Sequence, residues 1–154
     1  MSGTIEAEIE IEATPERVWS ELTDLETFPL WNPFIRSAEG ELRTGQRLKL
    51  RLLLGRRVIP LRPRLTRVEP PLELRWHAVT GVPGLFDTER SFRIEPLGEQ
   101  GVRFVQSEAN TGLLTGVVFR FTDFERHVRE GYGRLNRALK DRAESPASER
   151  LAAR

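Results

Sequence analysis

The chain has 154 residues, of which 38% are hydrophobic and 31% are charged, and its formal net charge at pH 7 is +1. This length fits a single domain with one core, and the near-neutral charge argues against a generally basic nucleic-acid-binding protein. The absence of cysteine excludes disulfides, thiol chemistry and Cys-based zinc sites, and 2 histidines are too few for a His-rich metal site. We therefore expect no metal and no cofactor.

The domain is expected to cover residues 1–143. Residues 144–154 form a small, polar tail that we expect to be disordered. No apolar run is long enough to span a bilayer, and no basic region followed by an apolar run indicates a signal peptide. The expected location is therefore the cytoplasm.

Apolar and acidic residues alternate from Ile5 to Glu12, which predicts a strand with one buried and one solvent-exposed face. Thr14 followed by Pro15 is typical of the cap and first residue of a helix. Thr23 with Glu26 resembles a capping box and predicts a second short helix.

The second short helix is expected to end near Phe28, because a residue that precedes proline avoids the helical region. Turn residues then separate six further expected strands. These strands lie near 34–40, 46–54, 57–68, 72–79, 86–95 and 101–110. Pro60 and Pro63 within one of them suggest an edge strand or a bulge.

Apolar residues recur at steps of three and four from Leu114 to Leu139 and predict one amphipathic helix of about 28 residues. Gly131 and Gly133 interrupt it, and they either open room beneath the helix or let it bend. The element order is typical of an α+β protein. We expect a curled, seven-stranded antiparallel sheet around the long C-terminal helix, with a cavity between them.

Several short motifs follow one another along residues 4–143, namely Ala13–Trp19, Leu22–Asp24, Trp31–Phe34, Leu72–Trp76, Gly84–Phe86, Ser91-Phe92 and Leu135–Lys140. In this order they resemble the SRPBCC group of the START and polyketide-cyclase superfamily. The resemblance implies a helix-grip fold with a hydrophobic ligand cavity between the sheet and the C-terminal helix. Family members often carry histidines in the strand that holds Arg90 and near Gln106. This sequence has neither, which argues against acid–base chemistry or metal binding by histidine at these positions.

The resemblance implies three alternative functions. The first is binding or transport of a small hydrophobic ligand, namely a lipid, a polyketide or an aromatic compound. The second is a polyketide cyclase or aromatase type of enzyme, in which the cavity holds the substrate folded. The third is a protein-interaction module that resembles the co-chaperone branch of the superfamily.

Two charged residues are expected on the inner face of the sheet. The two-residue period that turns Phe92 inward also turns Arg90 inward, and the period that turns Phe104 inward does the same for Gln106 and Glu108. In either of two hairpin registers, Arg90 and Glu108 are neighbours. They either bind the polar group of an otherwise apolar ligand or form a structural ion pair that solvent reaches.

Glu108 is also the weak candidate for a catalytic acid or base. Tyr132 either points its hydroxyl into the cavity or only packs. The expected ligand-binding residues are Trp31, Trp76, Arg90, Phe92, Phe104, Gln106, Glu108, Phe121 and Phe124. Asn110 shares their face, and Leu50, Leu52 and Leu74 complete the expected wall.

Charge is uneven along the chain, because basic residues occur throughout 43–67 without an acidic residue between Glu41 and Glu69. This hairpin is either a solvated outer face with cross-strand ion pairs or a patch for an acidic partner or anionic lipid. It lacks interleaved aromatic residues, so we expect no nucleic acid. The apolar loop at Leu85 and Phe86 is compatible with transient membrane contact. The sequence is compatible with both a monomer and a homodimer.

Overall fold

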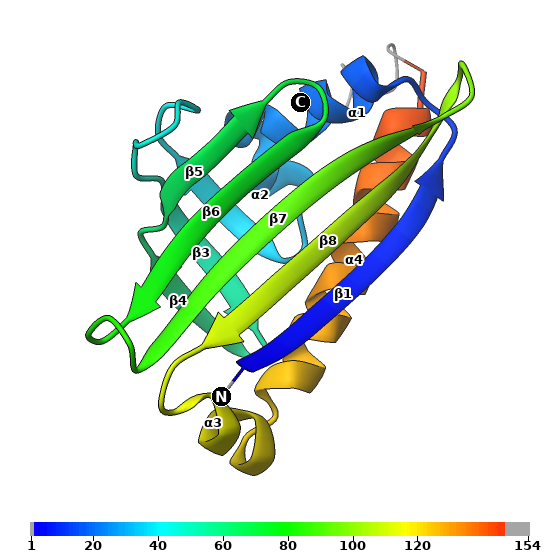
Figure 1. Ribbon diagram of the computed structural model, residues 1–154. Coiled ribbons are helices and arrows are strands. Elements are labelled where there is room, and N and C mark those ends of the chain that lie inside the picture. Colours follow the sequence, from blue (N-terminus) through cyan, green and yellow to red (C-terminus); the bar gives the residue numbers. More distant parts are fainter. Residues whose placement is uncertain (1, 147–154) are drawn as a thin grey trace.

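The computed structural model describes residues 2–146 and shows an α+β fold in which antiparallel strands pack against a long C-terminal helix (Figure 1). The strands are β1 (Ser2–Ile11), β2 (Ile35–Glu39), β3 (Lys49–Leu54), β4 (Arg57–Leu61), β5 (Arg64–Glu69), β6 (Glu73–Thr80), β7 (Phe86–Leu97) and β8 (Gly101–Thr111). The helices are α1 (Pro15–Thr23), the 3-10 turn η1 (Leu25–Thr27), α2 (Phe28–Trp31), α3 (Thr115–Phe121) and α4 (Phe124–Glu144).

The expected seven-stranded sheet is wrong. Within residues 2–146 the strands form a five-stranded sheet of order β1-β8-β7-β6-β5 and a three-stranded sheet of order β2-β3-β4. The strand expected over 57–68 divides at Arg62 and Pro63, where the chain passes from the small sheet into the large one. Proline has no backbone N–H to donate, so it suits this break. Pro60 lies in β4, an edge strand of the small sheet, in agreement with the edge-strand reading.

The alternation in β1 is confirmed, because Ile5 and Ile11 are buried while Glu6 on the other face is exposed. The start of α1 is confirmed as well. The Thr14 side chain accepts a hydrogen bond from the backbone N–H of Arg17 at 3.3 Å, and thereby satisfies one of the free donors at the helix start.

The capping box at Thr23 is wrong. The Thr23 hydroxyl donates back to the Trp19 carbonyl at 2.7 Å instead of capping the next turn. The second short helix, η1, does end next to Phe28, at Thr27, but the reason given for that end is wrong: Phe28 adopts helical dihedral angles and begins α2. Pro29 lies in the first turn of α2, where its missing N–H costs no helical hydrogen bond.

The single C-terminal helix is divided into α3 and α4. Thr122 is extended between them, and its hydroxyl donates to the Val118 carbonyl and accepts from the Phe124 N–H. These local hydrogen bonds compete with those of a continuous helix. The expected helix therefore begins again at Phe124, and α4 packs against β1 along the inner side of the sheet (Figure 1).

Gly131 lets α4 approach the core closely. A Cβ at this position would lie closer than 3.0 Å to ring atoms of the buried Phe34, whereas a Cβ at Gly133 would meet only the flexible end of Arg137 at 3.4 Å. Of the two readings for these glycines, room beneath the helix therefore applies to Gly131.

Substitution of the two glycines by alanine should have opposite effects. Gly131→Ala is expected to lower the free energy of unfolding by about 1–2 kcal/mol, since overpacking outweighs the gain in helix propensity. Gly133→Ala is the matched control and should raise it by about 0.5–1 kcal/mol. Urea denaturation checks both, and a stabilising Gly131→Ala would contradict the close approach.

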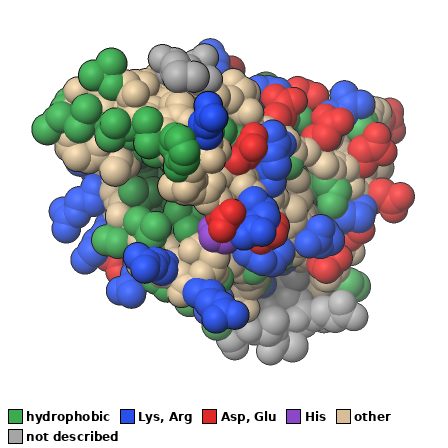
Figure 2. Space-filling view, turned by 90° about the horizontal axis from the view of Figure 1, so that it is seen from below, with side chains coloured by type: hydrophobic (Ala, Val, Ile, Leu, Met, Phe, Trp, Pro, Cys, Tyr) green, Lys and Arg blue, Asp and Glu red, His purple; other side chains and the backbone are tan. Residues whose placement is uncertain are grey.

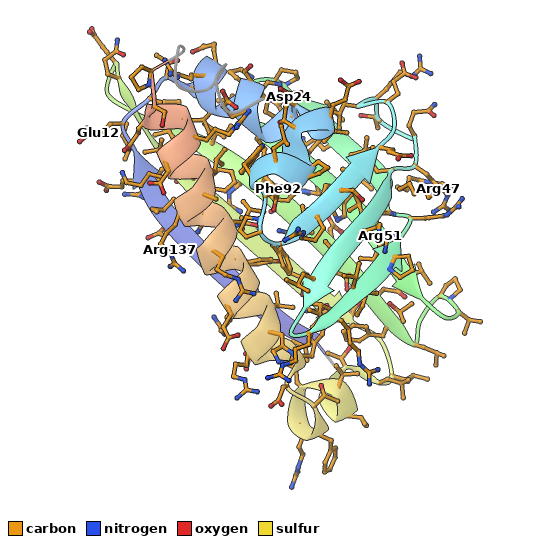
Figure 3. All side chains as sticks on the ribbon, turned by 180° about the vertical axis from the view of Figure 1, so that it is seen from behind. Glu12, Asp24, Arg47, Arg51, Phe92 and Arg137 are labelled. Atoms are coloured by element: carbon orange, nitrogen blue, oxygen red, sulfur yellow. The ribbon has the colours of Figure 1, made fainter. Side chains whose placement is uncertain are left out.

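The core lies between α4 and the two sheets, and it is closed at the far end by α1, η1 and α2 (Figures 1 and 3). The opposite end, which carries α3, the β3–β4 turn and the β6–β7 loop, is less tightly filled. Among the described helices, none is both long and apolar enough to cross a membrane. The predicted tail falls mostly on residues 147–154, which lie outside the described residues.

Candidate functional site

An apolar cavity of about 290 Å³ lies between the sheets and the first turns of α4. Its wall comes from both sheets and from the helices, and includes Leu52, Leu61, Trp76, Ala78, Phe124 and Val128. Figure 2 looks at the end of the molecule that carries α3 and shows hydrophobic side chains around a hollow there. Thr80 of β6 and Val118 of α3 line the cavity from this end.

Two charged residues, Arg90 and Glu108, also line this wall. Residue 90 of β7 pairs directly with residue 108 of β8, which confirms one of the two expected registers. The two residues are only 2% and 6% exposed, so bulk solvent does not reach them as the ion-pair reading requires. Within residues 2–146 the two side chains form no direct salt bridge with each other.

Arg90 is held by one amide and by aromatic rings. Its Nη2 donates to the Gln106 side-chain carbonyl at 2.5 Å. Its guanidinium carbon lies 4.6 Å from the ring centres of both Phe92 and Tyr132 and 4.9 Å from that of Phe34. Such rings attract a cation through their negative faces. The buried Nε has no hydrogen-bond partner, so the protein leaves this cation only partly satisfied.

Glu108 is bound at both carboxylate oxygens. The Tyr132 hydroxyl donates to Oε1 at 3.1 Å, and the Asn110 amide donates to Oε2 at 3.0 Å. Thr88 in turn donates to the Asn110 amide oxygen at 2.8 Å and fixes the direction of that amide. Glu108 therefore faces the cavity in a defined orientation.

Burial sets the charge state of this cluster. Desolvation lowers the pKa of Arg90, against the attraction of Tyr132 and Glu108; a guanidinium nevertheless stays charged at neutral pH. Desolvation also raises the pKa of Tyr132 well above its ordinary value of 10.0. The positive charge of Arg90 opposes that rise and Glu108 reinforces it. At neutral pH the cluster therefore holds a cation at Arg90 and a neutral phenol at Tyr132.

The structure brings some of the expected ligand-binding residues to the cavity. Trp76, Arg90, Glu108 and Phe124 line it. Gln106 lies behind Arg90, where its amide nitrogen donates to the Tyr132 carbonyl at 3.2 Å and to the Asn136 side chain at 2.7 Å. It orients Arg90 instead of forming the wall.

Other expected residues lie elsewhere. Phe92 and Phe104 are buried and stack on each other in the core. Trp31 packs against Phe28 at the far end of the molecule and donates its indole N–H to Thr27. Phe121 is 73% exposed, because the break after it removes α3 from the face that α4 turns to the core.

Asn136 is a site residue that the sequence reading missed. It lies four residues after Tyr132, and both are buried on the inner side of α4. The i, i+4 spacing was the available signal, since it places two residues on one helix face. The hydroxyl of Tyr132, for which two roles were open, donates to Glu108, which lines the cavity.

The fold and this cavity define the class: an α+β protein whose antiparallel sheets pack around a long C-terminal helix and enclose an apolar cavity with buried charge. Residues 2–144 match the model of a family described as polyketide cyclase / dehydrase and lipid transport, and the chain belongs to that family. The comparison with curated proteins gives no match.

Solved structures show the same fold. A START superfamily protein from Mycobacterium smegmatis matches with a TM-score of 0.71 and 20% identity, over 92% of this chain and 97% of the other. The Zhui aromatase/cyclase from Streptomyces sp. R1128 matches with a TM-score of 0.74 and 15% identity, over 94% of each chain. Norcoclaurine synthase from Thalictrum flavum, in complex with dopamine and hydroxybenzaldehyde, gives 0.65 and 14%, over 92% and 86%.

Proposed function

We propose that the protein binds a small, mainly apolar ligand whose polar group contacts Arg90 and Glu108 in the cavity. The observation that carries this proposal is the presence of two buried charged residues in an otherwise apolar wall. Burial of charge costs several kcal/mol unless it is compensated, and Arg90 keeps one nitrogen without a partner. A few polar groups in an apolar pocket are typical of sites that orient a ligand.

The chemistry of the cavity wall restricts the kinds of ligand that fit. Arg90 offers only N–H donors, so it favours a carbonyl or hydroxyl oxygen. A ligand with a full negative charge would also face Glu108, which disfavours it. The ligand that fits best is therefore an uncharged lipid-like, polyketide-like or aromatic molecule with one oxygen substituent near Arg90.

Binding of two probes that differ by one hydroxyl tests this proposal. Wild-type protein is expected to bind 2-naphthol about tenfold more tightly than naphthalene, because a hydrogen bond to a charged group contributes about 1.5–3 kcal/mol. Arg90→Met should remove this preference and leave naphthalene binding intact. Fluorescence titration measures both constants, and native mass spectrometry with solvent extraction identifies any molecule that copurifies.

The matched control is Arg93→Met on the same strand, because Arg93 is on the opposite face and pairs with Glu95. It should leave the preference unchanged. Ala78→Trp fills the cavity and should abolish binding of both probes. The proposal fails if Ala78→Trp binds the probes as well as wild type, or if Arg90→Met keeps the full preference for the hydroxyl.

A second candidate function is catalysis by the polyketide cyclase type of enzyme. The observation that favours it is the hydrogen bond from the Tyr132 hydroxyl to Glu108, which places a proton donor beside a carboxyl group that lines the cavity. Loss of turnover without loss of binding in Glu108→Gln would support it. The third alternative, a co-chaperone-like interaction module, is disfavoured because such a module needs no cavity.

A further inference from the structure

A basic cleft lies on the outside of the molecule, at the junction of the two sheets. The cleft has a volume of about 450 Å³, and its lining includes Arg47, Arg62, Arg64 and His77. It contains no acidic lining residue in the described part of the chain. Figure 3 shows Arg47 at this edge, directed away from the body of the molecule.

The strand register brings these basic residues together. Arg47 forms an isolated antiparallel bridge with Arg64, and Arg64 pairs with His77 across the next strand. Residues that pair across antiparallel strands have neighbouring side chains on one face. Three basic side chains therefore stand in one row, and two of them are arginines directly opposite each other. Like charges in this arrangement repel.

The backbone holds the row in place. The Arg47 head group donates to the Arg62 carbonyl at 2.9 Å. On either side, the Leu48 N–H donates to the Pro63 carbonyl at 2.9 Å and the Leu65 N–H donates to Gln46 at 2.8 Å. These backbone bonds fix the segment before β3 against the edge of β5. The backbone positions of Arg47 and Arg64 are thus fixed opposite each other by the fold.

Neighbouring arginines, in contrast, have acidic partners. On the same outer surface Arg67 pairs with Glu69 at 3.1 Å, and Arg75 pairs with Glu73 at 2.6 Å. Among the described residues, Arg47, Arg62 and Arg64 have no acidic partner at ion-pair distance, and His77 of the cleft lies 3.9 Å from Asp87. Among the described residues of segment 43–67, the expected cross-strand ion pairing is found at Arg67, which contacts Glu73 of the neighbouring strand at 3.4 Å. Arg43 pairs only with Glu41, two residues away in its own segment.

We propose that this cleft binds a phosphate-ester group through Arg47, Arg62 and Arg64. Guanidinium groups match phosphate oxygens with paired N–H donors, and a dianion between facing arginines removes their repulsion. The same chemistry fits a soluble phosphate monoester and the head group of a phosphatidic acid. Arg47, Arg62 and Arg64 do not line the apolar cavity, so this proposal does not rest on the ligand proposed there.

Calorimetric titration with inorganic phosphate and with glycerol 3-phosphate tests the site. Wild-type protein should show saturable binding, and Arg47→Gln/Arg64→Gln should bind at least about tenfold more weakly. Arg93→Gln/Arg103→Gln removes the same charge from arginines that have acidic partners. It should change the affinity by less than about twofold, since exposed charges act weakly at this distance. Arg62→Gln gives an independent third variant, with an intermediate loss expected.

Vesicles of phosphatidylcholine with and without phosphatidic acid identify the source of the group. If the protein floats with the phosphatidic acid vesicles and Arg47→Gln/Arg64→Gln does not, the group is a lipid head group. If the protein binds glycerol 3-phosphate but not these vesicles, the ligand is soluble. The absence of saturable phosphate binding in wild type overturns the proposal. So does an equal loss in Arg93→Gln/Arg103→Gln, because that result shows only a general effect of charge. Unchanged naphthalene binding in all variants separates this site from the cavity.

Discussion

Glu21→Gln is expected to lower the free energy of unfolding by about 3 kcal/mol, because it leaves the Arg142 guanidinium buried without its carboxylate. Arg142 Nε donates to Glu21 Oε2 at 2.6 Å, and the two side chains are only 7% and 9% exposed. Arg142 also lies 5.6 Å from the Trp31 ring. The pair thereby joins α1 and α2 to the end of α4 and closes the far end of the core.

Two comparisons make this effect specific to the buried pair. Glu125→Gln breaks an exposed ion pair with Arg129 on α4 and should cost less than about 0.5 kcal/mol. The double variant Glu21→Leu/Arg142→Met should recover most of the stability that Glu21→Gln loses, because two apolar groups replace two buried charges. Urea denaturation measures all three. A loss in Glu21→Gln no larger than in Glu125→Gln would contradict the structural role.

Tyr132 is expected to stay un-ionised in the folded protein at pH values where a free tyrosine has lost its proton. Burial raises its pKa well above 10.0, and it is the single tyrosine of the chain. The near-ultraviolet absorbance of tyrosinate therefore reports on this residue alone. The absorbance should stay low on titration of the folded protein above pH 10 and should appear only when the protein unfolds.

The same shift predicts how stability depends on pH. The folded-state pKa lies above the unfolded one, so the stabilising contribution is complete below about pH 10 and is lost as the pH rises further. In that window the slope is about 1.4 kcal/mol per pH unit. Tyr132→Phe should remove this slope and, at neutral pH, cost about 1–2 kcal/mol through the lost hydrogen bond to Glu108. A normal tyrosinate titration near pH 10 in the folded state would contradict the buried network.

Much of the local structure could be predicted from the sequence, because it depends on near neighbours. The alternation from Ile5 to Glu12 and the cap at Thr14 are both present in the structure. The two-residue period also placed Arg90 and Glu108 on the inner face, where they line the cavity. Each of these features follows from the geometry of one strand or one helix turn.

Because hydrophobic periodicity is a local property, the sequence could predict only part of the site. Periodicity identifies which face a residue occupies, but not how deep along the element it lies relative to other segments. Phe92 and Phe104 share the inner face with Arg90 and are core residues, whereas Val128 and Ala78 line the cavity without having been expected. The depth at which α4 crosses the sheets decides whether a residue on the inner face belongs to the packed core or to the cavity wall.

The sequence by itself determined the α+β class, the strand faces and the inward direction of Arg90 and Glu108. Only the tertiary structure decided that the chain changes sheets at Pro63, that the C-terminal helix breaks at Thr122, and that Tyr132 reaches Glu108. It alone also brought Arg47 opposite Arg64. The reason is physical: hydrophobic periodicity is a local property, while these contacts join segments that are far apart in the chain and depend on how whole elements pack.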